Sequence, residues 1–326
     1  MAIASNTPVP IPGGWTLAKH LKKGDYVFSS KGLPIQIVGT HEYVPINCYE
    51  VLLNDGVSIL VDNHTRFPVS DINRRWVENQ YQAKRKQRSI QKFASPEELL
   101  DIGLTTARGD RIFSINNTAP IQFLWEDHPV PPFIAGMWMT KRNRRGRFIL
   151  KPENIEFIKK KIRSYGWNYV EESGNLIEIR PSIAHAFITK YPTVPRLLPT
   201  EYCFGAIEQR IELLQGFLAL RPNAYNKKRK EFEIFSTDIR FLIVIQGICE
   251  SLGMKTHVFS RDHSSTHKLR FKTNIPLTKE QEIVPNLKNA GRRMITAVNT
   301  TQILSCIHID TAQPFVVGQG FLPIWH

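Results

Sequence analysis

The hydrophobic and polar positions of the first 70 residues follow the pattern of short strands. Residues 25–43 hold two runs rich in β-branched and aromatic residues, joined by Lys31-Gly32, and residues 48–70 repeat the arrangement around Asp55-Gly56. Runs of strand length separated by turn residues about every eight to twelve positions are typical of all-β units. The pattern therefore predicts a compact β unit in this part of the chain.

Near residue 118 the hydrophobic positions change to the period of amphipathic helices. Prolines begin the first predicted helix, where they are tolerated, and Gly166 and Gly253 end two of the others. The predicted helices lie at 131–139, 151–166, 206–220 and 237–253, a hairpin at 168–182, and later strands at 266–274 and 301–326. We infer that a helical block at 118–287 is inserted into a β unit formed by 1–117 and 288–326, since surface loops accept insertions.

Two of the predicted helices each contain a glycine in an apolar stretch, Gly136 and Gly216, 80 residues apart. A glycine inside a helix costs about 1 kcal/mol relative to alanine. One such glycine is easily incidental, but two in matching contexts form a weak internal repeat. They predict two helices that pack closely through the glycines and join two pseudo-symmetric halves.

Composition places the chain among ordinary globular proteins, with 42% hydrophobic and 22% charged residues in 326. No apolar run approaches the roughly 18 residues of a membrane span, and the first residues lack the pattern of a signal peptide. The four cysteines are far apart with no CxxC pair: Cys48, Cys203, Cys249 and Cys306. This spacing argues against a zinc site or a disulfide framework and fits a reducing, cytoplasmic compartment. We expect no cofactor and no membrane partner.

The net charge is +14, and basic residues cluster at three places, 84–88, 141–147 and 227–230. A single cluster is equally well explained as a solvated loop. Three in one chain favour a polyanion partner, most simply nucleic acid.

Four short motifs in order along the chain carry a family resemblance. The first spans residues 4–38, the second is VDNHTRFPVS at 61–70, and the last two are CIHIDTAQPFVV at 306–317 and GQGFLPIWH at 318–326. In the first motif the matching residues are Thr7, Val9, Trp15, Gly24, Asp25 and Val27. The chain resembles an intein, a self-splicing Hint domain, interrupted by a LAGLIDADG homing endonuclease domain. The resemblance implies a mostly β, horseshoe-like splicing domain with an inserted α+β domain of two αββαββα-type halves.

The resemblance also implies roles at the two ends of the chain. It places the first nucleophile of splicing at Ala2, where the family usually has Cys or Ser. His64 takes the place of the histidine that protonates the leaving amide nitrogen, although Val61 stands where the family usually has a threonine. His326 takes the place of the penultimate histidine that assists cyclisation of a final Asn. Without a nucleophile at Ala2 and without that Asn, we expect a truncated and splice-inactive chain.

Two interpretations of Ala2 stay open. An engineered alanine in an ordinary intein is favoured. A minority class of inteins begins with Ala and uses a cysteine of the penultimate motif, which would be Cys306 here; elsewhere in the family that place is often Asp. The minority class also has a Trp two residues after the second-motif histidine and a Thr before the final histidine, whereas this chain has Arg66 and Trp325.

The nuclease resemblance implies an acidic residue at the end of each glycine-bearing helix, where the pair would hold Mg²⁺. Counting five residues onward from Gly136 and Gly216 gives Lys141 and Arg221, with Pro222 where a glycine usually follows. Cations cannot ligate Mg²⁺, which demands oxygen ligands. We therefore expect no metal and no cleavage. DNA affinity is expected through Arg142, Arg144, Arg145, Arg147, Lys227, Lys228, Arg229 and Lys230.

The favoured hypothesis is an autocatalytic, single-turnover splicing element that leaves its host by acyl shift, transesterification and Asn cyclisation. Its expected partners are the flanking host segments (exteins) and double-stranded DNA, and the chain is expected to be monomeric. The alternative is a DNA-binding protein or homing endonuclease in which the β unit is only a scaffold. A third hypothesis is cleavage at one junction without ligation, as in related Hint domains.

Overall fold

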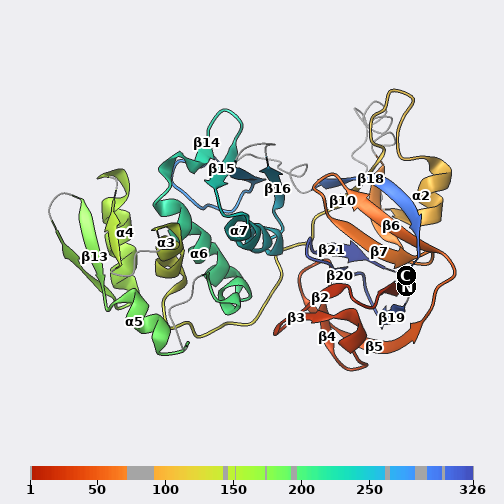
Figure 1. The fold of residues 1–326 in the computed structure, drawn as a ribbon, viewed down its shortest axis with the longest axis horizontal. Helices are drawn as coiled ribbons and strands as arrows, with labels where there is room; N and C mark the ends of the chain where they lie inside the picture. The colour runs from red at the N-terminus through yellow and green to blue at the C-terminus, as the bar shows by residue number, and fades with distance from the viewer. Residues whose placement is uncertain are drawn as a thin grey trace, which may run out of the picture. The chain divides into compact units, whose positions relative to one another are not determined.

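The computed structural model describes residues 2–71, 92–141, 146–150, 152–172, 175–191, 197–260, 265–282, 292–302 and 305–325. The chain forms two compact units (Figure 1). The first comprises Met1–Gln122, Cys249–His257 and Asn286–His326, and the second comprises Phe123–Ile248 and Val258–Pro285. The first unit is therefore built from both ends of the sequence, while the predicted boundaries at 117/118 and 287/288 lie within a few residues of this division.

A ten-stranded sheet organises the first unit. In order of pairing, its strands are β4 (Tyr26–Phe28), β5 (Pro34–Tyr43), β19 (Cys306–Thr311), β1 (Ala2–Ala4), β7 (Ser58–Asp62), β6 (Cys48–Leu53), β18 (Arg292–Thr301), β10 (Phe113–Asn116), β8 (Phe67–Asp71) and β9 (Lys92–Ala94). Two antiparallel ribbons accompany it: β2 (Pro8–Ile11) with β3 (Gly14–Leu17), and β20 (Phe315–Val317) with β21 (Leu322–Ile324). The predicted β character of 1–70 is thus confirmed.

The two predicted turns, at Lys31-Gly32 and Asp55-Gly56, are present between β4 and β5 and between β6 and β7. Gly32 follows β4 with a φ of 77°, and Gly56 follows β6 with a φ of 87°, both in the left-handed region that glycine enters without steric cost. At Gly32 an added Cβ would also lie only 2.0 Å from the carbonyl oxygen of Pro120. The turn therefore tolerates no side chain there.

Strand β1 lies between β19, which is near the end of the chain, and β7, which is near its start. Its Ile3 is the Cα partner of both Ile307 on β19 and Val61 on β7. All three side chains are buried in the core of this unit. Because neighbours along a strand face opposite sides of the sheet, Ala2 and Ala4 lie on the other face.

A short helix, α2 (Pro96–Ile102), completes the described secondary structure of this unit together with the 3₁₀ turn η1 (Ala18–His20). Helix α2 was not predicted from the hydrophobic pattern, although the signal for its first turn is strong. The Ser95 side chain accepts from the Glu98 N–H, the Glu98 side chain accepts from the Ser95 N–H, and Pro96 is the first helical residue.

Helices and two small sheets make up the second unit. Its helices are α3 (Pro132–Lys141), α4 (Pro152–Ser164), α5 (Ile183–Ile188), α6 (Ile207–Ala219) and α7 (Ile239–Ser251), with 3₁₀ turns η2 (Thr200–Cys203) and η3 (Pro222–Ala224). One sheet has the order β11 (Arg147–Ile149), β13 (Leu176–Arg180), β12 (Asn168–Glu171); the other has β14 (Tyr225–Asn226), β15 (Glu231–Ser236), β17 (His267–Lys272), β16 (Lys255–Ser260). The last residues of α7 and the first residues of β16 lie in the segment Cys249–His257, which belongs to the first unit.

The four predicted helices and the hairpin are present, and α4 and α7 are followed by Gly166 and Gly253 with φ of 73° and 76°. Helix α5 was not predicted. In the first half of this unit the described residues contain one strand between α3 and α4, whereas two strands separate α6 from α7. The two halves thus share the order helix, strand, helix, hairpin, with that difference among the residues that the structure describes.

Helices α3 and α6 pack against each other through the two glycines singled out in the sequence. A Cβ added at Gly136 would lie 2.1 Å from the carbonyl oxygen of Leu213, and one at Gly216 would lie 1.9 Å from that of Phe133. The Thr140 hydroxyl lies 3.2 Å from the carbonyl oxygens of both Gly136 and Phe217 and so reaches both helices. Backbone meets backbone at this crossing, which only glycine permits.

Candidate functional site

Residue 2 lies in the middle of the large sheet, on the face opposite the hydrophobic core. Ala2 is fully buried, and its Cα partner on β19 is His308. His308 in turn is the Cα partner of His41 on β5, and the two rings stack with centroids 4.5 Å apart. Directly opposed residues in antiparallel strands share a face. The face around Ala2 therefore carries two imidazoles.

The backbone of Ala2 is held by two buried polar side chains of the segment after β7. The Ala2 N–H lies 3.2 Å from Asp62 Oδ1 and 3.2 Å from Thr65 Oγ1. The Thr65 hydroxyl can donate to the Ala2 carbonyl oxygen at 2.9 Å or to Asp62 Oδ1 at 2.6 Å. Asp62 and Thr65 are 1% and 0% exposed, so this contact is shielded from water. The backbone nitrogen of residue 2 is thus held by two buried side-chain acceptors.

Asp62 is itself fixed by further donors. The Thr65 N–H donates to Oδ1 at 2.8 Å, and the Tyr43 hydroxyl donates to Oδ2 at 2.6 Å. Burial, together with the hydrogen bond to Asp62 and its negative charge, raises the pKa of Tyr43 far above its ordinary value. Tyr43 therefore keeps its proton and remains a donor to the carboxylate.

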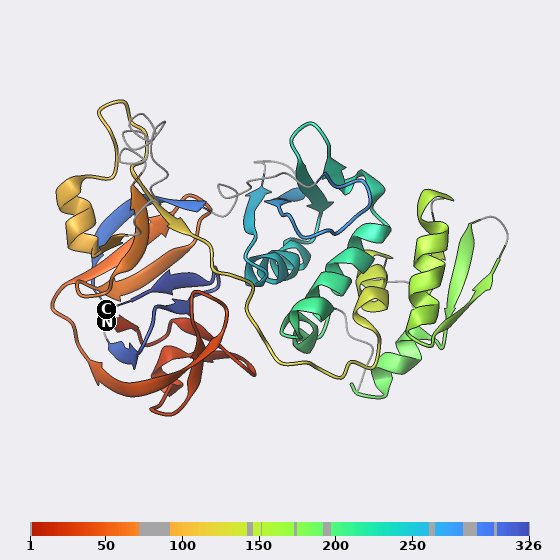
Figure 2. The ribbon, with the colours of Figure 1, turned by 180° about the vertical axis from the view of Figure 1, so that it is seen from behind.

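The last described residue of the chain reaches the same segment. The Arg66 N–H donates to the Trp325 carbonyl at 2.6 Å, and the Trp325 N–H donates to the Arg66 carbonyl at 2.8 Å. The Trp325 ring also packs on Phe93, with ring centroids 4.7 Å apart. Figure 1 and Figure 2 mark the two ends of the chain beside each other. Residues 62–66 thus contact Ala2 on one side and Trp325 on the other.

His64 lies inside this segment but its side chain is exposed. The hydrogen bonds to Ala2 come instead from Asp62 and Thr65, the residues two before and one after it. The role of His64 therefore stays a prediction, and so does that of His326, which lies outside the described residues. Sequence reasoning missed Asp62 and Thr65, because the motif was read only for its histidine.

Cys306 is fully buried, and its Cα partner is Ala4, two residues after Ala2. Burial, with the nearby Cys48 and Asp62, raises the pKa of the Cys306 thiol to about 12. Since the thiolate is the nucleophilic form, this environment disfavours attack by Cys306. The environment offers no support for the interpretation in which Cys306 acts first.

His308 is a third residue that the sequence motifs did not predict as part of the site. Burial is the largest of the effects that lower its pKa, and the neighbouring His41 adds to it. The imidazole is therefore held toward its neutral form beside residue 2. The alternation of side chains along 306–311 puts Cys306 and His308 on one face of the strand. Only the pairing with β1 shows that these residues lie opposite Ala4 and Ala2.

In the second unit, Arg221 follows α6 and packs against aromatic rings. Its guanidinium lies 4.7 Å from the Phe217 ring centroid and donates to the Phe235 carbonyl at 3.1 Å. Burial lowers the pKa of Arg221. Lys141 is the last residue of α3, and its side chain is outside the described part of the chain. The described residues contain no group of three or more His, Cys, Asp or Glu arranged to hold a metal ion.

The predicted DNA-binding residues are only partly described. Arg142, Arg144 and Arg145 lie outside the described residues, as does the cluster at 84–88. Arg147 is paired with Glu178 at 2.9 Å and Glu172 at 3.1 Å. The cluster of Lys227, Lys228, Arg229 and Lys230 is exposed after β14, with Arg229 near Glu231 and Glu233 and Lys230 3.3 Å from Glu282.

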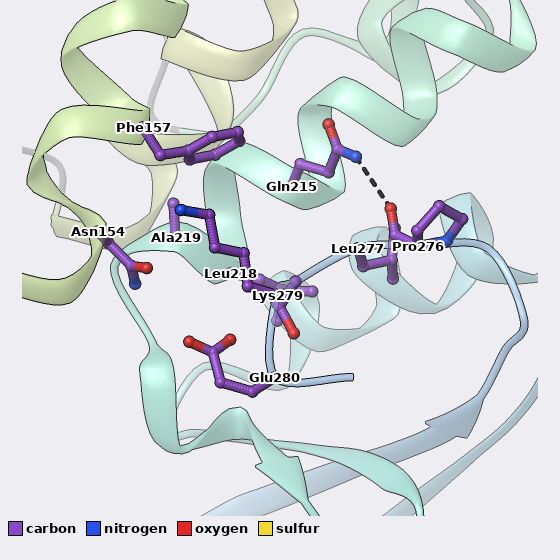
Figure 3. Close-up of a pocket in the computed structure, with 10 residues that line it drawn as sticks. Asn154, Phe157, Gln215, Leu218, Ala219, Pro276, Leu277, Lys279 and Glu280 are labelled. Atoms are coloured by element: carbon purple, nitrogen blue, oxygen red, sulfur yellow. Dashed lines mark hydrogen bonds between the residues drawn. The ribbon is translucent and has the colours of Figure 1, made fainter. Parts of the chain in front are cut away.

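A pocket of about 220 Å³ lies in the second unit between α4, α6 and residues 276–280 (Figure 3). Lys279 stands 5.5 Å from the ring centroid of Phe157, and Gln215 donates to the Pro276 carbonyl at 2.9 Å. Its lining contains no cysteine, serine or histidine. The pocket thus offers no nucleophile of these kinds. None of the described helices is long and apolar enough to cross a membrane.

No protein-family model matches the chain. Among curated proteins, the replicative DNA helicase DnaB of Mycobacterium intracellulare is 23% identical over 346 aligned positions, which cover 99% of this chain and 58% of that protein. DnaB of Mycobacterium leprae (strain TN) is 33% identical over 70 residues, covering 21% of this chain and 12% of that protein. The chain thus spans less than two thirds of the length of either relative.

Solved structures of two kinds are similar to different parts of the chain. A crystal structure of the MchDnaB-1 intein is 33% identical over 21% of this chain and 53% of its own, with a TM-score of 0.20. A variant of I-DmoI crystallised with its target DNA and Mn is 14% identical over 44% of this chain and 87% of its own, with a TM-score of 0.31. I-DmoI is a homing endonuclease. The similar structures therefore include both kinds of protein that the sequence motifs resemble.

Proposed function

We propose that this chain is a protein-splicing element, an intein whose β unit holds both of its junctions and whose inserted block is a homing-endonuclease-like domain. The observation that carries the proposal is the segment 62–66, which bonds to the amide of Ala2 and to the backbone of Trp325. A reaction that cuts and joins a chain at both ends of one insert needs these ends in one place. The similarity to one DnaB helicase over 99% of the chain, at 23% identity, fits an insert within a DnaB gene.

The chemistry follows from the residue that occupies position 2. A thiol or hydroxyl there would attack the preceding carbonyl carbon and convert the amide into a thioester or ester. The methyl group of Ala2 cannot attack. We therefore propose that the chain as it stands is splice-inactive by the ordinary route, and that His64 and His326 assist the two junction steps once the nucleophiles are present.

The test supplies the nucleophile. A reporter protein is fused before an Ala2→Cys variant, and cleavage by added thiol is followed on gels and by mass spectrometry. We expect thiol-dependent release of the reporter from the Ala2→Cys fusion and none from the unchanged fusion. Adding Asn-Ser and a second reporter after His326 should then yield the ligated reporter pair. An Ala2→Cys fusion that is folded and stays intact with thiol would overturn the proposal.

The same fusions decide between the two interpretations of Ala2. If Cys306 were the first nucleophile, the Ala2 chain carrying both reporters and the added Asn-Ser would splice without any change at position 2. Cys306→Ala would then abolish splicing. We expect no splicing by the Ala2 chain, because the buried Cys306 thiol has a raised pKa and pairs with Ala4.

For the inserted block, we propose DNA binding without cleavage. Arg221 stands where the nuclease resemblance implies an acidic metal ligand, and it packs its charge on Phe217. A guanidinium has no lone pair to offer Mg²⁺. The alternative, an active nuclease with the β unit as scaffold, requires metal-dependent cutting.

A gel-shift series with duplex DNA at increasing salt tests the binding, and incubation of plasmid libraries with Mg²⁺ or Mn²⁺ tests the cutting. We expect a salt-sensitive shift and uncut DNA. The joint change of Lys227 and Lys228 to Gln should weaken the shift, while Lys22→Gln in the β unit serves as the control. Metal-dependent cutting would contradict the proposal.

A further inference from the structure

The acyl shift changes the charge at one atom that the structure already surrounds. In the amide, the nitrogen of residue 2 is neutral. After the shift it is a free α-amino group, whose ordinary pKa of about 7.7–8.0 makes it mostly cationic at neutral pH. Groups that favour the shifted state must therefore stabilise positive charge at this nitrogen, more than they stabilise the amide.

Asp62 has the position and the bonding for that task. Its Oδ1 lies 3.2 Å from the Ala2 nitrogen, and the carboxylate has four donors within hydrogen-bond distance: the N–H groups of Ala2 and Thr65 and the hydroxyls of Tyr43 and Thr65. The single proton of the Thr65 hydroxyl goes either to Asp62 or to the Ala2 carbonyl oxygen. An ionised carboxylate is acceptor-only and offers about four lone-pair sites, so this donor set matches it. Three of the four donors belong to side chains or backbone that the reaction leaves unchanged. The carboxylate thus stays in place while the amide becomes an amine.

The low exposure of the site strengthens the effect. Asp62 and Thr65 are almost fully buried, and Ala2 is fully buried. Charge-charge attraction is larger in such surroundings than in water. A hydrogen bond from a cationic nitrogen to a carboxylate is roughly twice as strong as a neutral one. The Ala2–Asp62 contact therefore gains strength as the nitrogen gains charge.

We propose that Asp62 is a preformed counter-ion for the α-amino group that the acyl shift releases, and that Thr65 orients this group as a second acceptor. The inference rests on the proposed function. In the Ala2→Cys chain, the thiol that replaces the Ala2 methyl group loses its proton, and its sulfur bonds to the preceding carbonyl carbon. The carbon–nitrogen bond breaks, the nitrogen gains that proton, and a second proton from water makes it an ammonium ion beside Asp62. Asp62 is thus a catalytic residue, since it touches the leaving nitrogen.

The first experiment needs no splicing activity. Methionine aminopeptidase removes Met1, so that Ala2 carries a free α-amine, and ¹⁵N/¹³C NMR follows its titration. We expect the α-amine pKa to lie above the ordinary 7.7–8.0, and the Asp62 carboxyl carbon to shift with the same midpoint. Asp62→Asn should return the pKa to the ordinary range or below, whereas Asp110→Asn, an exposed loop change, should leave it raised. If the chemical shift of the Asp62 carboxyl carbon did not change as the α-amine titrates, the inference would be overturned without any variant.

The second experiment uses the Ala2→Cys reporter fusion. Asp62→Asn should slow thiol-dependent cleavage about tenfold or more, since hydrogen bonds to charged groups have effects of that size, and Asp110→Asn should not. Amide exchange spectra confirm that each variant is folded. If the Ala2→Cys fusion fails to cleave with Asp62 intact, the proposed function is wrong and the NMR titration still decides the counter-ion. If cleavage is equally fast in the Asp62→Asn variant, the inference is wrong and the proposed function stands.

Discussion

At the scale of single residues, His128 in the second unit shows how burial sets a charge state. Its ring stacks on Tyr202 with centroids 3.9 Å apart, and no hydrogen-bond partner for either ring nitrogen is present in the described residues. Burial, followed by the positive charge of Lys190, lowers the pKa of His128 to about 4. The folded protein thus keeps this imidazole neutral at a pH where the unfolded chain already protonates it.

This shift predicts a loss of stability in mild acid. The folded pKa of about 4 lies below the ordinary value of 6.5, so between these values the unfolded chain binds more protons and the free energy of unfolding falls as pH falls. Urea unfolding of the second unit at pH 7 and pH 5 measures the effect. His128→Phe keeps the stack on Tyr202 and should reduce the loss, while the exposed-helix change His185→Phe should not. Equal losses in the chain and the His128→Phe variant would contradict the assignment.

At the scale of elements, local signals predicted helices and hairpins but could not predict the site. Helices α4 and α7 follow a 3.6-residue period, and each is followed by a glycine with a positive φ, Gly166 and Gly253. Their C-terminal ends could therefore be predicted from the sequence. Helices α2 and α5 have only seven and six residues, too few for a clear period. The pairing of Ala2 with His308 joins residues about 300 positions apart, and no local pattern encodes such a register.

The same limit explains the choice of His64 over its neighbours. The motif drew attention to the titratable side chain, whereas the direction of each side chain in 62–66 depends on how this segment leaves β7. Asp62 and Thr65 point to Ala2, and His64 points to solvent. The close contact of α3 and α6 at their two glycines could be predicted. A glycine inside a helix costs stability, so its recurrence in two matching helices indicates that two backbones approach closely there.

The glycine contact gives an element-scale prediction. Gly216→Ala would place a Cβ 1.9 Å from the Phe133 carbonyl oxygen, so α3 and α6 must move apart. We expect a loss of about 1–3 kcal/mol, the usual cost of overpacking. Gly247→Ala in α7 meets no atom within 4 Å and should instead gain up to about 1 kcal/mol from helix propensity. Chemical denaturation of both variants measures the difference, and equal signs would contradict the crossing.

At the scale of the whole molecule, each unit has its own core although the chain passes between them more than once. The core of the first unit draws on residues from Ile3 to Ile324. One buried ion pair ties distant parts of this unit together: Arg293 on β18 lies 2.9 Å from Asp55 after β6, 3.9 Å from Glu250, and donates to the Gly320 carbonyl. Both partners of the Arg293–Asp55 pair are almost fully buried.

Separate cores predict two unfolding transitions that respond to different substitutions. Arg293→Met leaves Asp55 buried without its main partner, which typically costs about 3–5 kcal/mol, so it should lower the transition of the first unit alone. Gly216→Ala should lower only the other, and the double variant should show both shifts, since distant sites act additively. Calorimetry of the four chains tests this, with the exposed Arg108→Met as a neutral control. If either substitution moved both transitions together, the two units would unfold as one cooperative body, and the prediction of separate cores would be wrong.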